Sequence, residues 1–158
     1  MIFITLGSQK FQFDRLLKAV DDLIEQGAIT EEVFAQSGYS VYVPKHYHAK
    51  QFLDREEFAH WQEKADIVIT HGGTGAIIGA VKKKKKVIAV PRLAKYGEHV
   101  DDHQLQIIAQ FGEMNLICQC LDCQKLVESL NKVKNTQYAE YISNTQTIID
   151  SIDSFLHD

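Results

Sequence analysis

Two hydrophobic patterns alternate along the chain: short continuous apolar runs, and longer stretches in which apolar residues recur at helical spacing. Each pattern predicts one kind of secondary structure element. Brief, β-branched apolar runs predict buried strands over residues 2–6, 32–36, 67–69, 87–91 and 116–118, and residues 47–53 allow a further strand. Apolar residues at helical spacing predict helices over residues 14–26, 54–65, 76–81, 102–111, 122–130 and 138–156. Strands and helices therefore alternate along the chain.

This alternation predicts an α/β fold, a Rossmann-like parallel sheet with helices on both faces. No repeat, linker or low-complexity segment divides the chain, so we expect residues 1–158 to form a single domain. Ligands of such sheets bind at the carboxyl ends of the strands. Polar or glycine-rich turns follow four of the predicted strands, at residues 7–9, 36–38, 72–75 and 92–104, and we expect these turns to converge on one cleft.

The turn at residues 72–75 carries the most specific signal. It joins a buried strand, which continues into Thr70 and His71, to a helix that restarts the apolar pattern at Ala76. A strand, a glycine turn and a helix start bring backbone N–H groups and the positive end of the helix dipole to one point. This arrangement favours binding of an anion, most simply a diphosphate, and tight packing of strand against helix is the alternative.

Composition narrows the classes of partner. The chain has 158 residues, of which 45% are hydrophobic and 24% charged, and its net charge of -4 gives no support to nucleic-acid binding. No apolar run reaches the roughly 18 residues needed to cross a bilayer and no signal peptide is visible, so we expect a cytoplasmic protein. Cys118, Cys120 and Cys123 form one cluster, whereas structural zinc takes four ligands, so we expect reduced thiols and no metal.

Other motifs leave alternatives open. The turn after the first strand lacks the G-x-G-x-x-G of dinucleotide folds, and the turn at 72–75 lacks the G-K-[ST] of a P-loop. The lysine run 82–86 complements a helix C-terminus, with docking on an anionic membrane surface as the alternative. His71 is either a buried structural histidine or a wall of the site. Residues 98–104 are too polar for core packing and indicate hydroxyl binding or acid–base chemistry.

Three motifs together resemble one family. Residues 70–75 (Thr-His-Gly-Gly-Thr-Gly), 90–92 (Val-Pro-Arg) and 97–104, with Gly-Glu-His and Asp-His-Gln, are similar to the C-terminal, donor-binding domain of glycosyltransferase family 28. The resemblance extends from residue 1 to the last predicted strand. The segment 11–17 and the loop 91–104 narrow it to the small stand-alone subunits of bacterial exopolysaccharide and capsule synthesis. Those subunits are similar to the catalytic subunit of the eukaryotic two-chain enzyme that adds GlcNAc to dolichol-linked oligosaccharide.

The resemblance implies the C-terminal half of a GT-B glycosyltransferase that binds a UDP-sugar. It implies an inverting transfer to a lipid-linked sugar acceptor without a metal or cofactor. A membrane-anchored partner subunit would bind the acceptor and hold this chain, as a heterodimer, at the inner membrane face. The site residues carried over from the family are, for the donor, Gly7, Ser8, Gln9, Phe52, Leu53, His71, Gly72, Gly73, Thr74 and Gly75, and, for catalysis and the sugar hydroxyls, Glu98, His103 and Gln104.

One position departs from the family pattern. The family usually carries an acidic residue eight positions after His71, where it binds the ribose hydroxyls, and this chain has Gly79 there. Two hypotheses therefore stand side by side: a catalytic donor-binding subunit, and a non-catalytic enhancer that activates a membrane-anchored partner. A stand-alone sensor of a phosphate ligand is a third, for which no output domain is visible. The residues do not specify which sugar is transferred or to which acceptor.

Overall fold

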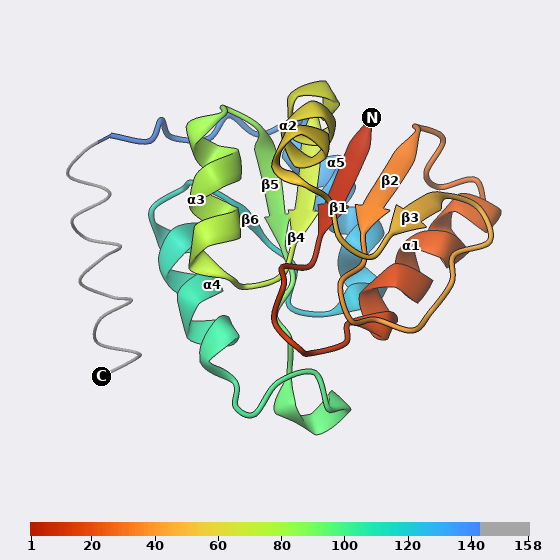
Figure 1. The fold of residues 1–158 in the computed structure, drawn as a ribbon. Helices are drawn as coiled ribbons and strands as arrows, with labels where there is room; N and C mark the ends of the chain where they lie inside the picture. The colour runs from red at the N-terminus through yellow and green to blue at the C-terminus, as the bar shows by residue number, and fades with distance from the viewer. Residues whose placement is uncertain (143–158) are drawn as a thin grey trace.

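A parallel sheet runs through the centre of the computed structural model, which describes residues 1–142 of the chain (Figure 1). The strands are β1 Ile2–Thr5, β2 Val33–Gln36, β3 His48–Lys50, β4 Ile67–Thr70, β5 Lys86–Ala89 and β6 Cys118–Gln119. The helices are α1 Asp14–Glu25, α2 Arg55–Lys64, α3 Thr74–Lys82, α4 His103–Glu113 and α5 Leu126–Lys134, with short 3₁₀ helices η1 Ala94–Tyr96 and η2 Cys123–Lys125. The first five predicted strands are confirmed, including one within residues 47–53, whereas the last, predicted over residues 116–118, is displaced to Cys118–Gln119.

The strand order is β3-β2-β1-β4-β5-β6 with every pairing parallel, which is the order of a Rossmann-like sheet. The chain builds outward from β1 to β3, then returns and places β4 on the other side of β1, where Ile2 pairs with Ile67 and Thr5 with Thr70. The strand order reverses between β1 and β4, and ligands of open α/β sheets bind outside the carboxyl ends at such a switch point. The turns after β1 and β4 therefore begin side by side.

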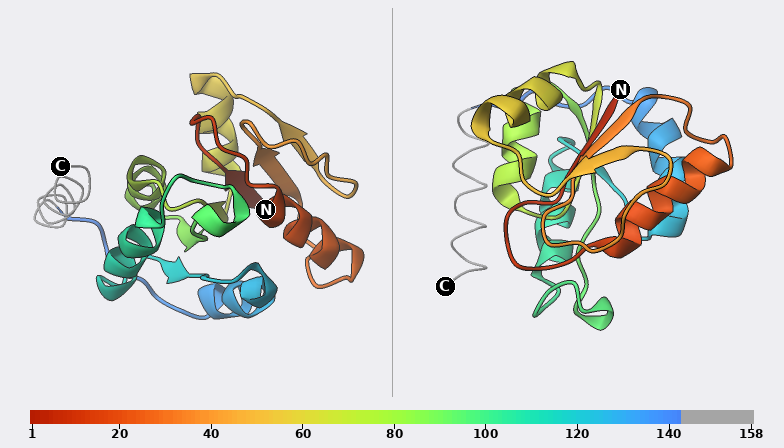
Figure 2. Two further views of the ribbon diagram at one scale, coloured as in Figure 1. Left: turned by 90° about the horizontal axis from the view of Figure 1, so that it is seen from below. Right: turned by 45° about the vertical axis from the view of Figure 1, so that its right-hand side comes forward.

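Helices cover both faces of the sheet, as the two views of Figure 2 show. Alternation along the strands supplies each face with apolar side chains. Ile4 of β1 and Ile69 of β4 pack on the face covered by α1 and α5, whereas Phe3 and Val68 pack on the face covered by α2, α3 and α4. The strands are buried on both faces, which explains why they appear in the sequence as continuous apolar runs.

Two predicted helix boundaries are confirmed by local geometry. The side chain of Asp54 accepts a hydrogen bond from the Glu57 N–H at 2.8 Å and starts α2. Gly27, with φ of 79°, follows the end of α1 and donates its N–H to the carbonyl of Ile24.

Two other helix boundaries differ from the prediction. Helix α4 continues through Gly112, and the chain turns at Asn115, whose φ is 55°. Asp122 accepts from Gln124 N–H at the start of η2, and α5 then runs to Lys134, so the helix predicted over 122–130 is displaced. Residues 138–142 are not helical, and the rest of the helix predicted over 138–156 lies outside the described residues.

Candidate functional site

A cavity of about 500 Å³ lies at the carboxyl ends of β1 and β4. Three segments form it: the turn after β1, the turn after β4 with the first residues of α3, and the start of α4 with the loop before it. Its lining residues are Gly7, Ser8, Gln9, His71, Gly72, Gly73, Thr74, Gly75, Ala76, His99, Asp101, His103, Gln104 and Ile107. The cavity therefore occupies the switch point of the sheet, where this fold places its ligands.

The imidazole of His71 fills the space between the two glycine turns. A Cβ atom added at Gly7 would lie 2.7 Å from His71 Nε2, and one added at Gly73 would overlap the same ring edge. Both positions therefore require glycine because the ring lies against them, and Gly7 also has a left-handed φ of 74°. Burial and, to a smaller extent, the nearby charges of Arg92 and His99 together lower the pKa of His71 to about 3, so the ring is neutral at pH 7.

The N-terminus of α3 opens onto the cavity. Its N-cap residue is Gly73, no side chain caps it, and no acidic residue lies in its first turn. The first N–H groups of an α-helix have no acceptor within the helix, and the helix dipole adds positive potential at the same end. This end of α3 is therefore suited to an anion.

Gln104 joins the turn after β4 to the end of β5. Its side chain is buried, and its carbonyl oxygen Oε1 accepts from the Gly72 N–H at 3.1 Å and from the Arg92 N–H at 2.9 Å. Its amide nitrogen Nε2 lies 3.4 Å from Nδ1 of His71. A Cβ added at Gly72 would lie 2.6 Å from the Cβ of Gln104, so the helix α4 packs directly on this turn.

A buried guanidinium lies behind the turn after β1. Arg92 is 1% exposed, and its Nη2 donates to the carbonyls of Leu6 at 2.7 Å and Phe11 at 3.2 Å, while the guanidinium lies over the ring of Phe13. Burial lowers the pKa of Arg92 to about 10, so the group keeps its charge at pH 7. Among residues 1–142 no carboxylate forms an ion pair with Arg92, and its Nε and Nη1 have no hydrogen-bond partner. The charge of Glu98 raises the pKa of Arg92, but this carboxylate is bound to Arg15 and makes no direct ion pair with Arg92.

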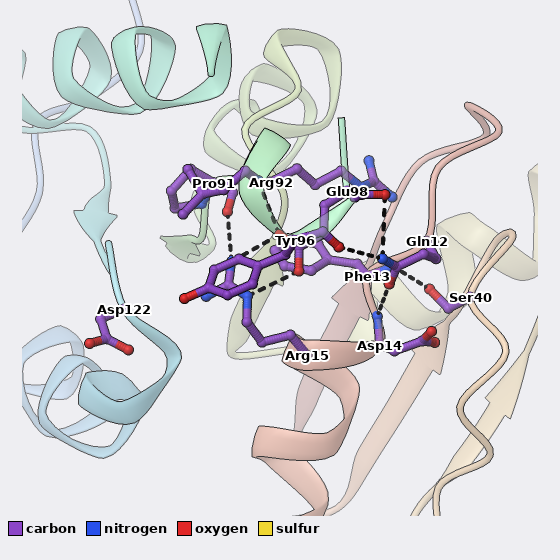
Figure 3. Close-up of polar contacts among 12 residues, drawn as sticks. Gln12, Phe13, Asp14, Arg15, Ser40, Pro91, Arg92, Tyr96, Glu98 and Asp122 are labelled. Carbon is purple, nitrogen blue, oxygen red and sulfur yellow. Dashed lines mark hydrogen bonds and ion pairs between the residues drawn. The ribbon is translucent and has the colours of Figure 1, made fainter. Parts of the chain in front are cut away.

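A second guanidinium anchors the loop between β5 and α4 (Figure 3). Arg15 of α1 binds Glu98 through two hydrogen bonds of 3.0 Å, and its Nη2 also donates to the carbonyl of Pro91 at 3.1 Å. The ring of Tyr96 lies over the Arg15 guanidinium at 4.5 Å. Glu98 is 1% exposed and also accepts from the Leu93 N–H. These contacts attach the loop to α1 and so set the position of the residues that follow it.

The carboxylate of Asp101 lies within ion-pair distance of two histidines that line the cavity. It lies 3.1 Å from Nδ1 of His99 and 3.3 Å from Nδ1 of His103, and it accepts from the His103 N–H at the start of α4. The backbone hydrogen bond and the two imidazoles lower the pKa of Asp101. Asp102 precedes the first residue of α4, but its side chain does not cap the helix and accepts from the N–H of Ala94.

The structure brings most of the predicted site residues together. Gly7, Ser8, Gln9, His71–Gly75, His103 and Gln104 all line the cavity. Glu98, predicted to be catalytic, does not, because its carboxylate is enclosed by the loop and by Arg15. Phe52 and Leu53 are not lining residues either: the ring of Phe52 is half exposed and packs edge-on against Tyr39, and Leu53 packs on the core.

The sequence did not single out Arg92 and Asp101 as contributors to the site. The Val-Pro-Arg motif contained Arg92, but only the folded chain shows that its guanidinium is buried and donates to the carbonyls of Leu6 and Phe11. Asp101 belongs to the polar segment 98–104, whose composition could have pointed to it.

Two further sequence expectations concern the lysine run and the cysteines. Lys82 ends α3, as predicted for a residue that complements the helix dipole, but Lys86 belongs to β5 and donates through Nζ to the carbonyl of Lys134. The three cysteines are free and buried. In residues 1–142 no group of three or more His, Cys, Asp or Glu side chains is arranged to hold a metal ion. No helix in this part of the chain has both the length and the apolar character needed to cross a membrane.

Solved structures of several glycosyltransferases have a similar fold. The solution structure of ALG13 superposes with a TM-score of 0.63 at 16% identity, covering 99% of this chain and 96% of ALG13. MurG of Acinetobacter baumannii superposes with a TM-score of 0.58 at 16% identity, covering 97% of this chain and 49% of MurG. The glycosyltransferase of kitacinnamycin superposes with a TM-score of 0.60 at 12% identity, covering 98% of this chain and 38% of that enzyme.

Sequence comparison identifies the family. The UDP-N-acetylglucosamine transferase subunit ALG13 of Candida albicans is 27% identical over 88 residues, which are 56% of this chain but only 28% of the length of that protein. The model of the glycosyltransferase family 28 C-terminal domain matches residues 1–155, nearly the whole chain. The chain, with its Rossmann-like sheet and its cavity at the switch point, therefore belongs to the C-terminal domain family of glycosyltransferase family 28.

Proposed function

We propose that this chain is the UDP-sugar-binding catalytic subunit of a two-chain, inverting glycosyltransferase of polysaccharide synthesis. The observation that carries the proposal is the concentration of positive potential around one cavity. The N-terminus of α3, which no side chain caps, and the glycine turn at 72–75 present backbone N–H groups, and the charge of Arg92 lies buried behind the turn after β1 without a direct ion pair. A diphosphate carries the complementary charge, and a cavity of about 500 Å³ has room for a nucleotide-sugar.

The transfer would be a single displacement. An acceptor hydroxyl attacks the anomeric carbon of the sugar, the bond from that carbon to the diphosphate oxygen breaks, and UDP leaves with the electron pair. The negative charge that develops on the leaving diphosphate is stabilised by the N-terminus of α3. The proton of the attacking hydroxyl passes to a general base on the acceptor side.

The acceptor side is assigned to a partner. The ALG13 relative is described as a subunit of a UDP-N-acetylglucosamine transferase, which supports action within a complex. We propose that a membrane-anchored partner binds a lipid-linked sugar acceptor and holds this cytoplasmic chain, as a heterodimer, at the inner face of the membrane. No metal or other cofactor enters the proposed reaction, because the α3 N-terminus supplies the positive potential for the diphosphate.

Titration of the chain with UDP, followed by backbone amide NMR, tests donor binding. We expect the amide signals of Gly72, Gly73 and Gly75 to shift in a saturable manner. If these signals do not move at millimolar UDP while the protein is folded, donor binding by this chain alone is wrong.

Substitutions at two glycines of α3 make the UDP test specific to this helix, and the first is at its start. A Cβ added at Gly75 meets nothing within 4 Å, so Gly75→Glu fits, and its carboxylate favours the helix N-terminus while it repels an anion. We expect unchanged or higher thermal stability with UDP binding weakened by about tenfold, or about 1.4 kcal/mol. Gly75→Ala, which fits equally well without the charge, is the matched control and should bind UDP like the wild type.

The second substitution addresses Gly79. The family pattern places an acidic residue there, and a Cβ at Gly79 also meets nothing within 4 Å. Gly79→Glu should therefore tighten UDP binding if this position of α3 faces the ribose. Unchanged affinity would show that the ribose is held elsewhere in this chain.

The second candidate function, a non-catalytic enhancer of the partner, is motivated by Gly79. Co-expression of the partner with the wild-type chain or with Gly75→Glu separates the two functions. Loss of sugar transfer with Gly75→Glu supports a catalytic donor subunit. Equal transfer by both complexes would support the enhancer.

A further inference from the structure

The side-chain amide of Gln104 has an orientation that its surroundings determine without ambiguity. Two backbone N–H groups, those of Gly72 and Arg92, point at one atom of the amide, at 3.1 Å and 2.9 Å. Both groups can only donate, so the atom between them must be the carbonyl oxygen. The amide nitrogen is therefore the atom that faces His71.

This orientation determines which ring nitrogen of His71 carries the proton. The Gln104 nitrogen Nε2 can only donate, and it lies 3.4 Å from Nδ1 of His71. Nδ1 must then accept, so the proton of the neutral imidazole is on its Nε2. Nε2 is on the ring edge that lies against Gly7 and Gly73, the two turns that line the cavity.

We propose that Gln104 is a positioning residue, which holds His71 as a neutral Nε2–H donor on the cavity wall and joins the turn after β4 to the end of β5. Gln104 is 5% exposed, its oxygen has two donors and its nitrogen faces His71, so the fold fixes the amide in one orientation. The family resemblance implies that Gln104 also faces the sugar hydroxyls, and the second N–H of its amide is compatible with that role because Gln104 lines the cavity.

The groups around His71 support an uncharged donor. His71 is 6% exposed, and the charged or titratable groups that act on it are Arg92 and His99, both of which oppose a second proton on the ring. Burial lowers the pKa of His71 to about 3. The tautomer should therefore be constant from about pH 5 to 8, and Nε2 of His71 should remain a hydrogen-bond donor over that range.

The tautomer is directly measurable in the ligand-free chain. Two-bond ¹H–¹⁵N NMR spectra of the imidazole rings distinguish the two neutral tautomers and the imidazolium, and a His71→Gln variant identifies the His71 signals among the seven histidines. We expect the Nε2–H pattern for the wild type at every pH from 5 to 8. An Nδ1–H pattern, or an average of the two tautomers, would overturn the inference.

Gln104→Glu tests whether Gln104 causes this state. A carboxylate still accepts from Gly72 and Arg92, so the turns stay joined, but its second oxygen now faces Nδ1 of His71 and attracts a proton there. We expect the ¹⁵N pattern to change to Nδ1–H or imidazolium and the titration of His71 to move into the measurable pH range. Gln106→Glu adds the same charge at an exposed position of α4 and should leave the His71 signals unchanged.

A change in stability without a change of tautomer in Gln104→Glu would mean that Gln104 only joins the turns, and the inference would be wrong. The effect of Gln104 on ligand binding rests on the proposed function. UDP titration distinguishes a failure of this inference from a failure of the proposed function. We expect Gln104→Glu to weaken UDP binding by about tenfold. A wild type that binds UDP with an Nδ1–H ring overturns only this inference, and a wild type with an Nε2–H ring that does not bind UDP overturns only the proposed function.

Discussion

Replacement of Glu98 by Gln distinguishes a structural carboxylate from a catalytic one. The carboxylate accepts two hydrogen bonds from Arg15 and one from the Leu93 N–H, all of 3.0 Å. Gln can keep the bonds to one oxygen, but its NH₂ group then faces the Nε–H of Arg15, and the guanidinium loses its counter-ion. Breaking a buried pair costs about 3–5 kcal/mol, and because Arg15 is 21% exposed, we expect about 2–3 kcal/mol for this change.

Urea denaturation of the wild type and of Glu98→Gln measures this loss, with the fluorescence of the single tryptophan, Trp61, as the probe, since its ring stacks on Phe34 at 3.9 Å. The loss corresponds to a decrease in melting temperature of roughly 5–10 °C for a chain of this size. UDP affinity should change less than about threefold, because Glu98 does not line the cavity.

Glu63→Gln, the same change at an exposed position of α2, is the matched control and should alter the free energy of unfolding by less than about 0.5 kcal/mol. A Glu98→Gln protein with wild-type stability and a strongly reduced rate of sugar transfer would refute the structural role and restore the catalytic prediction.

Three further measurements test other features of the fold. The pKa of His71 falls from 6.5 to about 3 on folding, so its neutral form contributes stability above pH 6.5 that is lost as pH falls toward 3. Between pH 7 and pH 5 the free energy of unfolding, measured with urea, should therefore decrease more steeply in the wild type than in His71→Gln, by up to about 1.4 kcal/mol per pH unit. An equal decrease in the two proteins would contradict this. Burial raises the pKa of Cys123 to about 12 and also raises that of Cys120, so iodoacetamide at pH 8 should modify these thiols only after unfolding; rapid labelling of the native chain would show that they are accessible. Gly79→Ala should raise the free energy of unfolding by about 0.5–1 kcal/mol, because the site is helical and open, and a decrease would reveal a contact that glycine alone permits.

Much of the candidate site could be predicted because each of its turns has a local signature. The glycine turn at 72–75 follows a strand that is recognisable from its apolar residues, and the turn at 7–9 follows another. Parallel strands present their carboxyl ends at one edge, so the convergence of the two turns followed from fold class alone. Phe52 and Glu98 came from the family pattern, and sequence could not show that one ring packs against Tyr39 or that the carboxylate binds Arg15 from α1.

The sequence by itself determined the class of fold, the position of the turns and the suitability of the α3 start for an anion, because these depend on hydrophobic periodicity, glycine and helix capping within a few residues. Tertiary structure alone decided that β4 lies beside β1, that the amide of Gln104 links Gly72, Arg92 and His71, and that the guanidinium of Arg92 is buried against the carbonyl of Leu6. These features depend on contacts between residues that are 12 to 86 positions apart in the sequence. No local pattern around either residue indicates which residue it will contact.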